Sequence, residues 1–102
     1  MAHFVLIGYD GPEGLERRKL HRERHLANLR PLDEAGRVIH GGPILDPAGD
    51  PLGSVVIFEA PDLDSARNFA ADDPYVVEGV FERYEVYETL VVFPASPQQS
   101  DS

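Results

Sequence analysis

Residues 17–29 read Arg-Arg-Lys-Leu-His-Arg-Glu-Arg-His-Leu-Ala-Asn-Leu, and the fold predicted for the whole chain is built around this stretch. It contains strong helix formers and neither glycine nor proline, so it predicts a helix. Its leucines recur at a spacing that would give this helix one buried face: Leu20, Leu26 and Leu29. The other elements are therefore expected to pack against one long helix.

Cationic and titratable side chains border that apolar face. On helical spacing, Arg18, then His21 or Arg22, and then His25 follow one another along one side. If this side faces a cleft, His25 is the group expected to handle protons, because an imidazole titrates at about 6.5 and small perturbations move it across neutral pH.

The charge balance limits the partners. The chain has 102 residues, enough for one domain, with 18 acidic and nine basic residues and a formal net charge of −9. Such a charge repels phosphate backbones and anionic lipid surfaces, so we expect binding neither to nucleic acid nor to membranes. The basic residues concentrate in residues 17–30, so a local positive patch could attract a small anion.

The chain has no cysteine. This excludes a disulfide framework, a thiolate nucleophile and a zinc–thiolate cluster, and we expect no cofactor. The apolar run near the amino terminus is too short for a signal peptide or a membrane span, so a soluble cytoplasmic protein is the default expectation.

The order of elements predicts the fold class. Strands are expected at residues 3–9, 37–45, 54–59 and 80–93, and helices from residue 12 or 13 to 34 and over 61–72. Pro31 leaves the end of the first helix open, because a proline kinks or ends a helix, and Gly36 is the expected stop. The pattern is β-α-β-β-α-β, an α+β, ferredoxin-like arrangement with two helices on one face of a four-stranded antiparallel sheet. Residues 1–93 would form this domain and residues 94–102 a disordered polar tail.

The sheet is expected to bury both faces. The strands at 4–7 and 54–58 carry apolar residues on both alternating faces, whereas the helices cover only one. We therefore predict a homodimer in which two copies pack sheet to sheet.

A second unusual stretch, residues 72–79, reads Asp-Asp-Pro-Tyr-Val-Val-Glu-Gly. If the two helices lie side by side, Asp73 can approach His25, accept a hydrogen bond from one ring nitrogen and make the imidazole more basic. The alternative is ordinary, because Asp-Pro often ends a helix and a helical histidine beside a leucine is often only half-buried.

Several short motifs resemble the YCII-related domain family. They are Arg22-x-x-His25-Leu26 with Leu29, Gly36-Arg37, Gly42-Pro43, Asp73-Pro74-Tyr75-Val76 and Gly79-Val80. The resemblance covers about residues 3–93. It implies a ferredoxin-like fold related to the muconolactone-isomerase type of dimeric α/β barrel, with an active site of one histidine and one aspartate, which match His25 and Asp73.

Other residues are weaker candidates. Arg22 or Arg18 would hold a substrate's negative charge. Gly42 and Pro43 match the family's Gly-Pro, Ser54 could line the cleft, and Tyr75 could either donate to a substrate oxygen or simply pack. His21 and His25 have the spacing of two metal ligands on one helix face, but no third ligand is evident, so no metal is expected.

Three functions follow from these patterns. The leading hypothesis is a small acid-base enzyme, an isomerase or lyase, that acts on a small molecule, anionic or cyclic, through the His25–Asp73 pair. The alternatives are a binding module that uses the same pocket without chemistry, and an accessory dimerisation domain.

Overall fold

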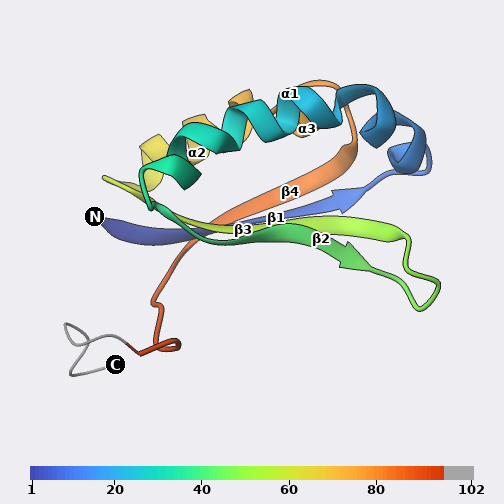
Figure 1. Cartoon of the computed structure of the whole chain (residues 1–102). Helices are drawn as coiled ribbons and strands as arrows, with labels where there is room; N and C mark the ends of the chain where they lie inside the picture. The colour runs from blue at the N-terminus through green and yellow to red at the C-terminus, as the bar shows by residue number, and fades with distance from the viewer. Residues whose placement is uncertain (96–102) are drawn as a thin grey trace.

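The computed structural model describes residues 1–95 as one sheet with helices gathered over one of its faces (Figure 1). In chain order the elements are β1 (Ala2–Asp10), α1 (Gly14–Glu34), β2 (Val38–Leu45), β3 (Pro51–Ala60), α2 (Leu63–Asp72), α3 (Pro74–Val77) and β4 (Phe81–Thr89). The strands pair antiparallel in the order β2-β3-β1-β4. The ferredoxin-like α+β fold is therefore confirmed, with one short additional helix, α3.

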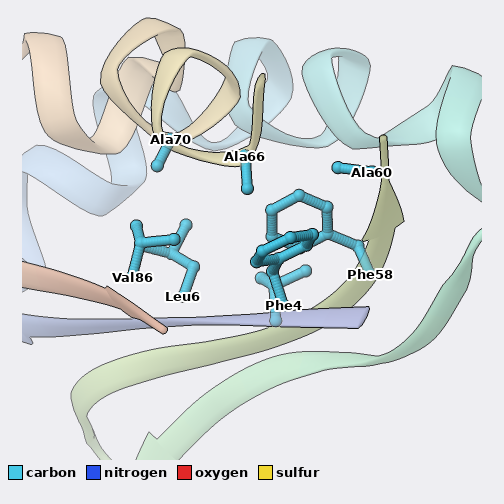
Figure 2. Packing of buried hydrophobic residues seen from close by; sticks show 8 residues of the cluster. Phe4, Leu6, Phe58, Ala60, Ala66, Ala70 and Val86 are labelled. Atoms are coloured by element: carbon cyan, nitrogen blue, oxygen red, sulfur yellow. The ribbon is translucent and has the colours of Figure 1, made fainter. Parts of the chain in front are cut away.

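The core lies between the sheet and the helices. Phe4 pairs with Phe58 and Leu6 with Val56 across β1 and β3, and all four side chains are buried. Figure 2 shows Ala66 and Ala70 of α2 above Phe4, Leu6 and Phe58. Both alanines are fully buried, so these small residues of α2 pack directly against the large side chains of the sheet.

Helix α1 runs through Pro31, which neither ends nor shortens it as the sequence had left open. The helix ends three residues later, where Gly36 has a φ of +72°, the amide of Gly36 donates to Asp33 and that of Arg37 donates to Leu32. This is the glycine-based helix end that the sequence predicts. One prediction for α1 is wrong, because Leu20 is 75% exposed and does not share the buried face of Leu26 and Leu29.

The segment after α2 contains a short helix that the sequence did not predict. Asp73 ends α2 with extended backbone, as a residue before proline should, but its side chain also accepts from the Tyr75 amide and begins α3. Pro74 is the first residue of α3, a position where the missing amide hydrogen costs nothing. The chain therefore turns sharply at Asp73.

The last strand is shorter than the predicted 80–93. It ends at Thr89, and the chain then leaves the sheet on the side away from the helices (Figure 1). Most of the predicted tail, residues 96–102, lies outside the described part of the chain. Within that described part, no helix is long and apolar enough to cross a membrane.

The face of the sheet opposite the helices carries a group of aliphatic side chains on its two central strands. These are Val5, Ile7, Val55 and Ile57, which we call the outer face. They pair across β1 and β3 and stay half-buried beside their neighbours, although no helix covers them.

The start of α2 gives a pH-dependent prediction. The Asp62 carboxylate accepts from the Ser65 amide at 2.8 Å, and this bond lowers the pKa of Asp62 below its ordinary 3.8. A carboxylate with a lowered pKa stabilises the fold above its unfolded-state pKa and loses that contribution as the pH falls through its folded pKa. In Asp62→Asn, an amide oxygen still caps the helix but no longer titrates.

We therefore expect the melting temperature of Asp62→Asn to fall less steeply than that of the parent as the pH drops below about 4. Asp64→Asn, which removes a negative charge from the same turn, should follow the parent curve. Parallel curves for Asp62→Asn and the parent, measured by circular dichroism, would contradict this role.

Candidate active site

A cleft of about 660 Å³ lies between α1 and the β2–β3 side of the sheet. The charged side chains that line it are Arg18, Lys19, Arg22, Arg30 and Asp33. In a chain of net charge −9, this lining is dominated by cations. The cleft is therefore the place where a small anion would be attracted.

His25 and Asp73 meet at this cleft. Nδ1 of His25 lies 2.8 and 3.0 Å from the two carboxylate oxygens of Asp73, and both residues are buried. His25 lines the cleft, whereas Asp73 is fully enclosed behind it. Nε2 of His25 has no partner among the described residues, so it is the ring nitrogen left for a ligand.

Asp73 is held by more than one donor. Its carboxylate also accepts from the Tyr75 amide at 2.8 Å and lies 3.4 Å from the Asn28 amide nitrogen on α1. The carboxylate thus has three donors around it: the His25 ring nitrogen, the Tyr75 amide and the Asn28 amide. The joint between α2 and α3 thus fixes both the position of the carboxylate and the tautomer of the imidazole.

Tyr75 packs flat on the imidazole. The rings of His25 and Tyr75 lie 3.9 Å apart and within 3° of parallel, and Tyr75 is buried. Burial raises the pKa of the Tyr75 phenol above 10.0, although the charges of Arg18 and Arg22 oppose the shift. The phenol therefore stays protonated at neutral pH, where it can donate a hydrogen bond but not act as a base.

Arg18 has partners that the sequence did not reveal. Its guanidinium donates to both carboxylate oxygens of Asp10, at 2.6 and 2.9 Å, and to the Ser54 hydroxyl at 2.9 Å. The same group lies 5.1 Å from the centre of the Tyr75 ring. Arg18 lines the cleft, but because its guanidinium is already paired with Asp10, it is less available to an anion than an unpaired arginine would be.

Arg22 differs from Arg18. It is exposed, lines the cleft and forms no hydrogen bond or ion pair with any other described residue. Its charge lies near enough to Tyr75 to act on the phenol's pKa. Arg22 is therefore the predicted anion-binding arginine whose guanidinium is free to hold a ligand.

The remaining predicted residues fall into two groups. Gly42, Pro43 and Ser54 line the cleft together with His25. His21 does not line it, and its Nδ1 accepts from Arg24 on the exposed side of α1. In the described part of the chain, no group of three or more His, Cys, Asp or Glu residues is arranged to hold a metal ion.

Asp10 and Asn28 are the site residues that sequence reasoning missed. Asn28 is three residues after His25, a spacing that places it on the same side of α1. Asp10 ends β1 eight residues before Arg18. A carboxylate at the end of a strand, shortly before an arginine in the first turns of a helix, was the feature of the sequence that could have indicated this ion pair.

The fold and the site together define an α+β ferredoxin-like domain with a buried His–Asp pair, whose histidine lines a cleft. The chain belongs to the YCII-related domain family, which it matches over residues 2–90. It is 38% identical over 98 residues to Protein YciI of Escherichia coli O6:H1, covering 88% of this chain and 98% of that protein. An uncharacterized protein of Haemophilus influenzae is 38% identical over 87 residues, covering 78% and 87%.

Solved structures share the fold. The 5-chloro-2-hydroxyhydroquinone dehydrochlorinase TftG from Burkholderia phenoliruptrix, in complex with 2,5-dihydroxybenzoquinone, matches with a TM-score of 0.79 at 30% identity, covering 86% of this chain and 93% of that chain. An uncharacterized NIPSNAP-like domain protein from Burkholderia xenovorans matches with a TM-score of 0.55 at 20% identity, covering 93% and 88%. The second likeness concerns the fold alone.

Proposed function

We propose that this protein is a small acid-base enzyme of the isomerase or lyase type, acting on a small hydroxylated ring that carries negative charge. The observation that carries the proposal is the His25–Asp73 pair, with Nδ1 engaged by the carboxylate and Nε2 left for the cleft. A histidine oriented in this way is suited to taking a proton from a bound molecule and returning it at another atom.

The proton would pass through Nε2. Because Nδ1–H donates to Asp73, the neutral ring carries its lone pair on Nε2, where a substrate proton can be taken. The buried carboxylate then stabilises the imidazolium that forms, without taking the proton itself. Tyr75, stacked on the ring, prevents the imidazole from turning out of this position.

The cleft walls favour an anion. Arg22 supplies a charge without a partner in the described chain, and the protonated phenol of Tyr75 offers a donor beside it. An ionised hydroxyl or enolate oxygen could accept from both groups while a ring carbon faces Nε2. These contacts would hold negative charge at the oxygen where it develops during proton transfer.

The relative with a TM-score of 0.79 supports a lyase reaction. A dehydrochlorination removes one proton and one chloride, so it needs a base for the proton and lets the chloride leave with its bonding electrons. His25 could serve as that base, and chloride could leave to solvent through the open side of the cleft. A keto–enol isomerisation of a similar ring would use the same first step.

The direct test uses 5-chloro-2-hydroxyhydroquinone as the substrate and 2,5-dihydroxybenzoquinone as the ligand. We expect chloride release by the purified protein and saturable binding of the quinone. Binding of the quinone without chloride release or proton exchange on the ring would favour the non-catalytic binding module. If the protein neither binds the quinone nor releases chloride, the proposed substrate class is wrong.

We also propose that two copies of the chain form a dimer through the outer face. Two supports are the four aliphatic side chains that no helix of the same chain covers, and membership of the YCII-related family, whose resemblance implies the dimeric α/β barrel class. A second copy would bury the same surface on both protomers, as two-fold symmetry requires.

A charge on the outer face should separate the dimer. We expect the parent protein to have twice the chain mass of 11.3 kDa in light scattering at micromolar concentration, and Ile57→Lys to have the single-chain mass. Leu20→Lys is the control, because Leu20 is 75% exposed on α1, and it should leave the mass at the parental value. A single-chain mass for the parent would remove the dimer proposal.

A further inference from the structure

Two glycines of β2 have no explanation in the fold. Of the nine glycines in the chain, three have a positive φ: Gly36, Gly49 and Gly79. At three others an added Cβ would lie under 3.0 Å from neighbouring atoms: Gly8, Gly14 and Gly53. A Cβ at Gly11 would come just to contact distance from Glu82. Gly41 and Gly42 have no positive φ, and an added Cβ at either would clash with nothing.

Gly41 has room for a side chain. A Cβ at this position would meet only Val38 and Val56, at 3.8 and 4.0 Å, which is ordinary contact. Glycine inside a strand destabilises it, because the backbone loses more freedom on folding and no side chain packs. Stability alone would therefore favour a larger residue at this position.

The space that Gly41 leaves belongs to the cleft. Gly41 pairs with Val56 across β2 and β3, and Val56 points toward the helices, so the missing side chain of Gly41 would point the same way. From α1, the same cleft is lined by His25, by the apolar Leu26 and Leu29 and by the cations Arg22 and Arg30. The cleft that His25 lines thus has strand backbone without a side chain at Gly41 in one wall and apolar and cationic side chains of α1 in the other.

We infer that Gly41 determines which ligands reach His25, because its missing side chain leaves a slot in which a flat ring can lie against the backbone of β2. His25 is the independent sign of a ligand, since it is about nine-tenths buried and its Nε2, which has no partner in the described chain, opens on the same cleft. The inference rests on the proposed function in one respect, that the ligand must reach this nitrogen.

The test measures access to His25 without any substrate. Diethyl pyrocarbonate acylates unprotonated imidazole, and tryptic cleavage after Arg24 separates the His25 peptide from that of His21, so mass spectrometry gives each rate. We expect Gly41→Leu to slow the acylation of His25 at least fivefold and Gly41→Ala to slow it less. The rate at His21, outside the cleft, should not change.

Glu88→Leu is the matched control. It places the same side chain on the helix-facing side of the opposite edge strand, since Glu88 pairs with Phe4, and it lies outside the cleft. Its His25 rate should equal that of the parent. An unchanged His25 rate in folded Gly41→Leu would overturn the inference.

Gly41→Ala tests separately whether the fold itself needs glycine at this position. It should melt at the parental temperature or above, because alanine loses less backbone freedom than glycine. A clear fall in melting temperature would show that the fold itself requires glycine here and would also overturn the inference. Since acylation needs no turnover, failure of the proposed reaction would leave both results interpretable.

Discussion

Replacing His25 by asparagine is expected to lower turnover by roughly 10²- to 10⁴-fold, the usual contribution of a positioned acid-base group. The asparagine amide can still donate to Asp73 from about the place of Nδ1, so the buried carboxylate keeps a partner. The variant loses the nitrogen that faces the cleft, together with the ring that stacks on Tyr75. Chloride release from 5-chloro-2-hydroxyhydroquinone, measured over a range of concentrations, should show the loss in kcat rather than in KM.

Three further variants test whether the loss of turnover is specific to the His25–Asp73 pair. His25→Ala should lose turnover as well, while the protein remains folded. His21→Asn makes the same exchange one turn earlier on α1, outside the cleft, and should turn over at the parental rate. Asp73→Asn should also lower kcat, because its amide group holds the wrong tautomer of the imidazole. Parental turnover by folded His25→Asn would remove the mechanism.

Replacing Arg18 by methionine is expected to destabilise the fold by about 3–5 kcal/mol, the usual effect of removing one partner of a buried ion pair. The side chains of Arg18 and Asp10 are only 10% and 7% exposed, and two hydrogen bonds join them. Methionine fills similar space but leaves the Asp10 carboxylate buried without its counter-ion. Urea unfolding of the parent and the variant measures the difference.

An exposed ion pair provides the comparison. Arg24→Met breaks the bond from Arg24 to Glu78, whose side chains are 58% and 37% exposed, and should change stability by less than about 1 kcal/mol. Adding Asp10→Asn to Arg18→Met should recover part of the lost stability, because it removes the uncompensated charge. An Arg18→Met variant no less stable than Arg24→Met would show that the Asp10 pair contributes little.

Periodicity predicted the fold because it depends on local rules. The continuous apolar runs in residues 4–7 and 54–58, and the turn signals around them, were enough for the order of strands and helices. The failures have tertiary causes. Pro31 was ambiguous because only three residues of helix follow it. Leu20 is 75% exposed, although its spacing from Leu26 and Leu29 allowed a shared buried face.

The site was predictable where the spacing of residues along a helix and the position of a helix end constrain it. His25 and Asp73 could be paired in advance because a helical histidine and a carboxylate at a helix end lie on neighbouring helices. The partnership of Arg18 with Asp10 could not, because it depends on how the end of β1 meets the first turn of α1. The α3 turn was missed for a similar reason, since four residues are too few to show helical periodicity.

Asp73 has two structural roles in this fold. Its backbone and carboxylate make the corner between α2 and α3, and the same carboxylate orients the imidazole. Any sequence that keeps this corner therefore also keeps the imidazole in its orientation, whereas the cleft wall at positions such as Gly41 and Arg22 can change without disturbing the pair.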